Sequence, residues 1–194
     1  MRYIIILLLI IGVGVYLYTT HHSPETDISF EVQADHVKAV CKDFEFIFSP
    51  QSAFQTEATI MQVSHENDCP FSVFCGSFGL VWGDTAIELA SYWDKNIKDI
   101  FDQLSPDAQK IYTERGCGGT AQYLNEHTIT MLPIAPNKEI DKALRALKRG
   151  DKVSLEGYNV TIISAQYQGH VQSLNIPHTV CITKAVINNE TYGE

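Results

Sequence analysis

The sequence predicts an α+β protein in which an N-terminal transmembrane helix precedes one β-rich domain, a curved sheet or a partly open small barrel with two or three helices. Three observations lead to this prediction. Residues 3–20 form a long run without charge. Short segments of alternating apolar and polar residues, typical of strands, dominate the remainder. Stretches with apolar residues at intervals of three and four indicate amphipathic helices between those strands.

The apolar N-terminal run is long enough for a short membrane span. About 20 apolar residues suit a spanning helix, and about 17 is the lower limit. Arg2 precedes the run, whereas Glu25 and Asp27 follow it. This charge bias places the N-terminus in the cytoplasm and the rest outside. A cleaved signal peptide is the alternative, although no Ala-x-Ala-like site follows the run.

These observations predict three segments: a transmembrane anchor (or signal peptide) at 1–20, a tether at 21–37 and an exported globular domain at 38–194. The predicted location is the inner (cytoplasmic) membrane, crossed once, with the C-terminal domain in the periplasm or outside. Residues 3–20 are the predicted contact with the membrane.

The exported part is acidic. It holds all 23 acidic residues but 13 of the 14 basic ones, because only Arg2 precedes it, which gives a net charge of −10. Such a surface disfavours nucleic acid and anionic lipid as partners. The alternative interpretation is that this net charge serves only to keep a small domain soluble. The length suits one domain with its own core.

The first half of the domain begins with two predicted strands. In Val40–Phe48 three phenylalanines alternate with Asp43, Glu45 and Ile47, and Phe54–Ser64 also alternates. The segment from Ser49 to Ser52, which contains Pro50, is predicted to separate them. Residues 71–82 are rich in aromatic residues and glycine, which indicates an irregular, buried stretch.

A helical region follows. Apolar residues between Ile87 and Leu104 recur mostly at spacings of three and four and predict an amphipathic helix. Ser105 is a suitable N-cap and Pro106 a suitable first residue of a second helix. The glycine-rich residues 115–119 are expected to end it.

The C-terminal third predicts four strands and one helix. Residues 128–132 are a short strand, and Asn137 caps a helix at Lys138–Lys148 that ends at Gly150. Strands are then expected at 152–156, 160–165 and 179–187. We expect a single core that contains Phe44, Phe46, Trp82, Trp93, Leu144, Leu147, Val153, Leu155 and Val180.

Four segments, at 44–64, 78–84, 124–136 and 147–160, resemble in order the motifs of an uncharacterised family of membrane-anchored bacterial proteins. The family's motifs are a Pro-x-Ala-x-Phe turn between strands, Trp-Gly, an Ile-Pro-Ala-like segment and a Pro-Gly-Asp-x-Val-x-Leu-x-Gly-Tyr-like segment. The resemblance implies a similar fold, topology and export, and no particular chemistry. The family's Asp falls on Ser77, and its paired histidines are reduced to His127.

The five cysteines suit an oxidising compartment, where two pairs and one odd thiol are expected. Cys69 and Cys75 are the disulfide candidates, because a bridge between them would close a small loop. No zinc-binding spacing is present, so we predict no metal site and no cofactor.

Catalytic candidates are few. Cys75-Gly76-Ser77 is superficially similar to the nucleophile segment of papain-like proteases, for which His127, His170 or His178 would be the base. The second cysteine of that segment is missing, and a buried cysteine is the simpler interpretation. Trp82 and Trp93 are expected in the core, with ligand stacking as the alternative.

The sequence therefore predicts a membrane-anchored extracytoplasmic binding or assembly module of unknown partner, most simply another envelope protein. The alternatives are a cysteine- or acid-based hydrolase, with Cys75 and His127 as candidates, and a periplasmic small-molecule or metal sensor. A hydrolase requires a cleft with a titratable group of shifted pKa. A sensor requires a closed apolar cavity or a converging His/Cys set.

Overall fold

The computed structural model describes residues 28–32, 36–65, 71–168, 170–171 and 178–193. The predicted membrane span at 3–20 lies outside these ranges. Within them, no helix combines the length and the apolar character that crossing a membrane requires. Strand β1 (Ile28–Val32) and the start of β2 occupy part of the stretch that the sequence assigned to a tether.

The described residues form an α+β fold in which nine strands make one sheet and four α-helices accompany it. The strands are β1 (Ile28–Val32), β2 (Val37–Cys41), β3 (Phe44–Ser64), β4 (Ser77–Val81), β5 (Thr128–Ile134), β6 (Lys152–Tyr167), β7 (His170–Val171), β8 (Thr179–Ile187) and β9 (Glu190–Gly193). The helices are α2 (Asp84–Ser91), α3 (Ile97–Ile100), α4 (Pro106–Glu126) and α5 (Lys138–Arg145), with 3₁₀ turns η1 (Phe71–Val73) and η2 (Phe101–Gln103).

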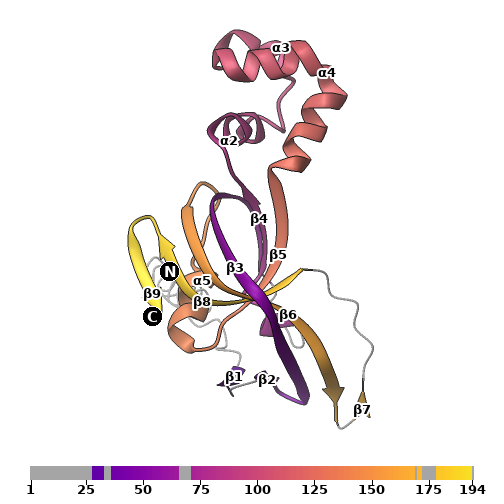
Figure 1. Cartoon of the computed structure of the whole chain (residues 1–194), viewed down its shortest axis with the longest axis vertical. Coiled ribbons are helices and arrows are strands. Elements are labelled where there is room, and N and C mark those ends of the chain that lie inside the picture. The colour runs from indigo at the N-terminus through magenta and orange to yellow at the C-terminus, as the bar shows by residue number, and fades with distance from the viewer. Residues whose placement is uncertain (1–27, 33–35, 66–70, 169, 172–177, 194) are drawn as a thin grey trace, which may run out of the picture.

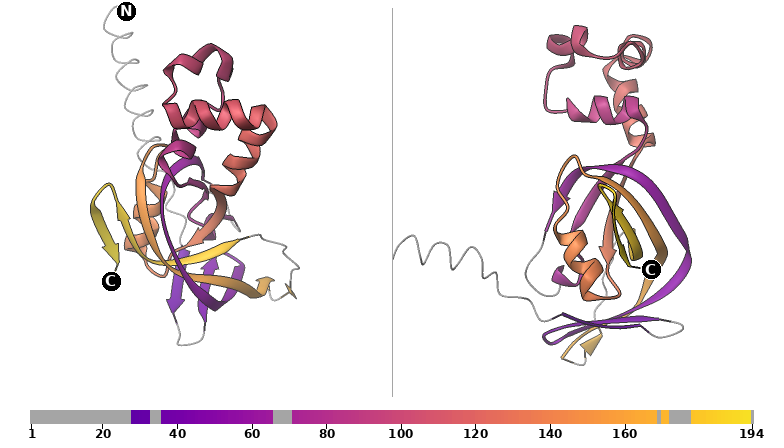
Figure 2. Two further views of the ribbon diagram at one scale, coloured as in Figure 1. Left: turned by 45° about the horizontal axis from the view of Figure 1, so that its top comes forward. Right: turned by 90° about the vertical axis from the view of Figure 1, so that its left-hand side faces the viewer.

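Five strands close into a ring. β3 pairs with β4, β4 with β5, β5 with β8, β8 with β6, and β6 returns to β3; only the β5–β8 pair of this ring is parallel. The ring lies in the middle of the molecule, with the helical arm α2–α4 at one end and β1, β2 and β7 at the other (Figure 1). Helix α5 packs Ile140 and Leu144 into the ring's core. Figure 2 shows the long strands β3 and β6 curving around the ring.

Each of these long strands replaces two predicted ones. Residues 44–64 are one strand, and so are residues 152–167. The turn signals that suggested breaks are bulges instead: the β3–β6 register shifts between Pro50 and Ala53, and the β6–β8 register shifts between Glu156 and Gly157. Proline and glycine are tolerated at bulges, where the ladder is already interrupted and the strand bends.

The core consists of three clusters rather than the single one that was predicted. Leu144, Leu147, Val153, Leu155 and Val180 share the ring cluster, which confirms that part of the prediction. Phe46 belongs to a second cluster between the ring and the β1–β2 end, with Phe44 packed against it. The third cluster joins Val81 of β4 to the helical arm. The tryptophans belong to none of these clusters: Trp82 is half-buried, and Trp93 is 60% exposed.

The helical arm also differs from its prediction. The expected helix between Ile87 and Leu104 is interrupted after Ser91. A new helix begins at Ile97, where Asn96 Oδ1 accepts a hydrogen bond from Lys98 N (3.2 Å).

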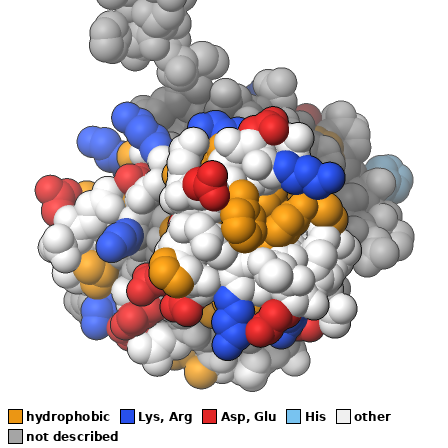
Figure 3. Space-filling model, turned by 90° about the horizontal axis from the view of Figure 1, so that it is seen from above, with side chains coloured by type: hydrophobic (Ala, Val, Ile, Leu, Met, Phe, Trp, Pro, Cys, Tyr) orange, Lys and Arg blue, Asp and Glu red, His pale blue; other side chains and the backbone are white. Residues whose placement is uncertain are grey.

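The capping prediction for the next helix is confirmed, since Ser105 Oγ accepts a hydrogen bond from Ala108 N at 3.3 Å. That helix does not end at the glycine-rich stretch. It kinks at Gly116 (φ 63°, ψ −173°) and continues to Glu126. Seen from the arm's end, hydrophobic side chains gather in a patch edged by side chains of both charges (Figure 3).

The C-terminal third agrees best with its prediction. Asn137 Oδ1 accepts a hydrogen bond from Ile140 N (3.0 Å), which fixes the start of α5. The helix ends at Arg145, three residues earlier than predicted. Gly150 takes a positive φ of 97° in the turn to β6, a conformation that glycine adopts without strain. Strand β8 has the predicted bounds, Thr179–Ile187.

Candidate functional site

A short connection between α5 and β6 forms one side of the candidate site. Gly150 N donates to Ile60 O at 2.7 Å, and Ile60 N donates to Asp151 O at 2.9 Å. These two bonds fasten the connection to β3 at the rim of the ring. Arg149 precedes Gly150 and therefore stands at the rim, beside the helical arm.

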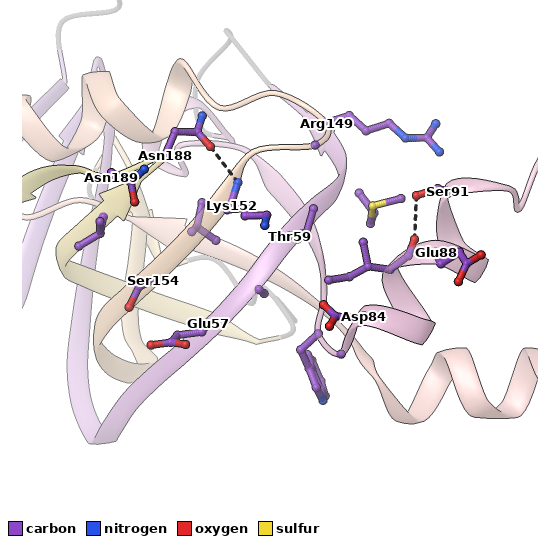
Figure 4. Close-up of a pocket in the computed structure, with 18 residues that line it drawn as sticks. Glu57, Thr59, Asp84, Glu88, Ser91, Arg149, Lys152, Ser154, Asn188 and Asn189 are labelled. Carbon is purple, nitrogen blue, oxygen red and sulfur yellow. Dashed lines mark hydrogen bonds between the residues drawn. The ribbon is translucent and has the colours of Figure 1, made fainter. Parts of the chain in front are cut away.

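A groove of about 800 Å³ lies between this rim and helix α2 (Figure 4). Its helical wall presents Asp84, Ile87, Glu88 and Ser91, whose spacings of three and four place them on one face of α2. The opposite wall comes from β3, β6 and the end of β8. The lining residues there and at the ends of the groove are Glu57, Ala58, Thr59, Met61, Trp82, Gly83, Arg149, Gly150, Lys152, Val153, Ser154, Val186, Asn188 and Asn189.

Several polar groups of this groove already have structural partners. Glu88 accepts hydrogen bonds from the backbone N (2.7 Å) and the hydroxyl of Ser105, and so holds the start of α4. Asn188 accepts from Lys152 N (3.1 Å) and donates to Asp151 Oδ1 (2.8 Å), which fixes the rim. The walls of the groove are therefore held in place by bonds within the protein.

A second groove of about 480 Å³ adjoins the first. It shares Met61 and Arg149 with the larger groove and extends over the outer face of β4 and β5, where Gly79 and Thr130 contribute to its floor. Arg149 lies 3.7 Å from Asp94, which follows α2 in the chain. We call the two together the α2 grooves. The remaining lining residues of the smaller one are Gln62, Val81, Ala90, Trp93, Leu124, Asn125 and Thr128.

The α2 grooves contain both tryptophans of the chain. Trp82 lines the larger groove and Trp93 the smaller one. The Trp82 ring lies 6.4 Å from the ring of His127, which in turn lies 4.2 Å from the ring of Tyr123. The prediction that both tryptophans are core residues is therefore wrong, and the alternative of a binding surface fits their positions.

No family model, curated protein or solved structure matches this chain. The site is therefore interpreted from its own geometry.

The structure does not bring the predicted catalytic residues together. Ser77 pairs with Ser64 at one end of β4, whereas His127 adjoins the other end, where Val81 pairs with Thr128. The two ends of β4 are four residue steps apart, roughly 13 Å. His127 Nδ1 donates to Tyr123 O at 2.8 Å, so this nitrogen is occupied by the end of α4. His170 and His178 are exposed on β7 and just before β8.

Cys75 is placed where it is a poor nucleophile. The side chain is fully buried in the ring core, and its Sγ donates to Asp141 Oδ1 at 3.4 Å. Burial raises the pKa of the Cys75 thiol well above its ordinary value, and the negative charge of Asp141 raises it further. The Cys75 and His127 hypothesis of a hydrolase therefore lacks the low-pKa thiol and the nearby base that such an enzyme requires.

The acid beside Cys75 has a structural partner. Arg145 Nε donates to both oxygens of Asp141 (2.9 and 3.0 Å), and Arg145 Nη2 donates to Ser72 O and Phe74 O. This arginine fastens the 3₁₀ turn η1 to helix α5. The cluster around Cys75 holds the fold together away from the α2 grooves.

The predicted pairing of Cys69 with Cys75 is wrong in the structure. Cys75 is a free thiol, as are Cys117 and Cys181, and Cys69 lies outside the described residues. The Cys75 side chain lies in the ring core, where its Sγ bonds to Asp141. Cys41 is disulfide-bonded. Among the described residues, no three His, Cys, Asp or Glu side chains converge as a metal site.

Sequence reasoning missed the groove residues for identifiable reasons. Arg149 directly follows the helix predicted at Lys138–Lys148, and its position in the sequence does not reveal that the turn at Gly150 places it on the rim. Gly79, Thr128 and Thr130 face outward from short strands, and nothing in their spacing marks a concave surface. The two tryptophans carried the only usable signal, because large aromatic residues supply binding surfaces as readily as cores.

Proposed function

We propose that this chain is a membrane-anchored extracytoplasmic binding module that holds its ligand or partner in the α2 grooves. The observation that carries the proposal is that both tryptophans line these grooves. An apolar aromatic surface beside a few polar side chains, in a concavity of several hundred Å³, is the usual composition of a binding site.

Binding is favoured over hydrolysis by the placement of the reactive groups. Cys75 is buried with a raised pKa, and its neighbours Asp141 and Arg145 are engaged with each other. The groove itself brings carboxylates, an arginine and amides together, but no cysteine or histidine lines it among the residues described. The carboxylates of the groove serve ligand recognition, and Glu88 also holds the start of α4 through its hydrogen bonds from Ser105.

The strand order adds an analogy. Counted from β3, the ring runs first, second, third, fifth, fourth and back to first, with α5 between the third and fourth strands. We infer that this is an OB-type barrel, a partly open small barrel in which the second and third strands form the usual binding face. These strands are β4 and β5, the floor of the smaller groove. A shared fold supports a binding role and selects no ligand.

The membrane attachment rests on the sequence. The uncharged run at 3–20, preceded by Arg2 and followed by acids, supports a single-pass inner-membrane anchor with the domain outside the cytoplasm. The resemblance to uncharacterised membrane-anchored bacterial proteins supports the same arrangement. Another envelope protein is the proposed partner of the anchored module.

Complementation of a deletion strain tests the binding role. Thr130→Arg, which fills the smaller groove, is expected to lose function, and Thr161→Arg on the exposed part of β6 is the matched control that retains it. Cys75→Ala and His127→Gln are expected to retain function wherever limited proteolysis shows a folded domain. If a folded Cys75→Ala variant fails while Thr130→Arg succeeds, the hydrolase alternative replaces the binding role.

A further inference from the structure

We propose that the α2 grooves take a neutral oligosaccharide, with a sugar ring stacked on Trp93. This inference rests on the proposed binding function and names the class of ligand for the same site. It is carried by three properties of the grooves: an exposed tryptophan, a lining of amides and hydroxyls in the smaller groove, and a second tryptophan at a distance that suits an oligomer.

The tryptophan is presented to solvent by a fixed turn. Trp93 N donates to Ala90 O at 3.2 Å and Lys95 N to Tyr92 O at 2.8 Å, so the chain is held tightly just after α2. The Trp93 side chain is nevertheless 60% exposed. A flat, rigid aromatic face loses little conformational entropy on binding and stacks well on the C–H face of a pyranose ring.

The polar groups beside Trp93 match hydroxyl groups rather than ions. Gln62, Asn125 and Thr130 line the smaller groove and are exposed. Amides and hydroxyls both donate and accept hydrogen bonds, as a sugar hydroxyl requires of its partners. The two charged residues of this groove, Asp94 and Arg149, lie 3.7 Å apart with opposite charges, so they leave little net field to select an ionic ligand.

The larger groove extends the site. Trp82 and Trp93 precede and follow α2, whose eight residues span roughly 12 Å along its axis. A single sugar unit that stacks on Trp93 does not reach Trp82, whereas an oligomer that follows α2 contacts both grooves. Three carboxylates, Glu57, Asp84 and Glu88, and two cations, Arg149 and Lys152, line the larger groove, so its net charge does not attract an anionic polymer.

The floor also argues against an extended peptide that adds to the sheet. β4, which carries Gly79 and Val81, is paired on both sides, with β3 and with β5. It offers no free strand edge, and strand addition is the commonest way for a sheet to bind an extended peptide. A ligand recognised through its side groups and ring faces fits this floor better.

Tryptophan fluorescence tests the proposal with full-length protein. In the Trp82→Phe variant all tryptophan emission comes from Trp93, and in Trp93→Phe all of it comes from Trp82. The probes are β-1,4-linked N-acetylglucosamine and glucose oligomers of one to six units, a sulfated oligosaccharide and a neutral peptide of similar length. Isothermal titration with the wild-type protein gives the affinities.

We expect a saturable change in Trp93 emission with at least one neutral oligosaccharide series, and affinity that rises with chain length until the Trp82 signal also responds. Trp93→Ala is expected to weaken binding about tenfold, the effect of about 1.4 kcal/mol of lost contact free energy. Tyr158→Ala is the matched control: Tyr158 is 46% exposed on β6 and lines neither groove, so its removal leaves the affinity unchanged.

The inference is overturned by the absence of a saturable signal with any neutral oligosaccharide, by an equal loss of affinity in Tyr158→Ala, or by preference for the sulfated probe. If the peptide binds with a dependence on Trp93, the oligosaccharide class is wrong while the binding function stands. If oligosaccharide binding is Trp93-dependent but the oligomer is cleaved during the titration, the ligand class stands and the proposed function fails.

Discussion

A matched pair of glycine substitutions tests the ring most directly. Gly157 lies at the register shift where β6 crosses β8. A Cβ at this position would lie 1.9 Å from Cys181 O and 3.0 Å from Ile182 Cα, both in the backbone of β8. Because these atoms belong to a paired, buried strand, they cannot move aside as a side-chain tip could.

We expect Gly157→Ala to lower the free energy of unfolding by about 3–5 kcal/mol, from about 1–3 for overpacking and about 1 for each of two disturbed ladder bonds. Gly118→Ala is the control with the same chemical change. Apart from its chain neighbours and the backbone of its own helix, nothing lies within 4 Å of the added Cβ, and Gly118 is exposed within α4. That variant should gain about 0.5–1 kcal/mol from helix propensity.

Urea denaturation followed by tryptophan fluorescence measures both changes, with far-UV circular dichroism as a check on the folded baseline. A loss below about 0.5 kcal/mol for Gly157→Ala, the range of ordinary surface substitutions, would show that β6 and β8 do not approach as described. If Gly118→Ala gains stability while Gly157→Ala loses it, the result supports the close approach of β6 to β8.

Four further predictions concern packing, cysteine chemistry and topology. Leu147→Ala should cost on the order of 2–5 kcal/mol in the same urea assay, because Leu147 is 3% exposed in the ring cluster; a cost below about 0.5 would mean that the segment following α5 does not pack there. A non-reduced peptide map should show Cys41 in a disulfide-linked peptide and Cys75 and Cys181 as free thiols; a free Cys41 or a linked Cys75 refutes this. Burial raises the pKa of Cys181 from 9.0 to about 12, so the free energy of unfolding should fall as pH rises from 9 toward 12, where only the unfolded thiol ionises; the fall should be smaller in Cys181→Ala. Alkaline phosphatase fused after Glu194 should be active, and an inactive fusion would reverse the predicted topology.

The sequence predicted best those elements whose signals are local. The Asn137 cap, the turn at Gly150 and strand β8 each depend on residues close together in the chain, and the structure contains all three. Ser105 and Pro106 likewise start α4 as expected. In these places the hydrogen bond or the backbone angle is set by the residue itself, so no knowledge of distant contacts was needed.

The long strands could not be predicted in this way. Pro50 and Gly157 are ordinary signals of chain reversal, yet each sits in a strand that continues because a partner is bonded beside it. Whether such a residue makes a turn or a bulge depends on contacts more than a hundred residues away in the chain, such as the pairing of Phe54 with Gly157. The same limit applies to Trp93, since its apolar character does not reveal whether another element covers it.

The position of the α2 grooves follows from how the arm joins the ring. The chain leaves β4 through Trp82 and Gly83 and returns to β5 through His127, and the two crossings are bonded to each other by Trp82 N donating to His127 O at 3.2 Å. Beyond these crossings, the arm contacts the ring mainly through the cluster at Val81. A ligand in the larger groove touches α2 on one side and β3 and β6 on the other. Its binding free energy therefore depends in part on the position of the arm relative to the ring. Ligand binding and the position of the arm are therefore coupled, whatever class of ligand occupies the site.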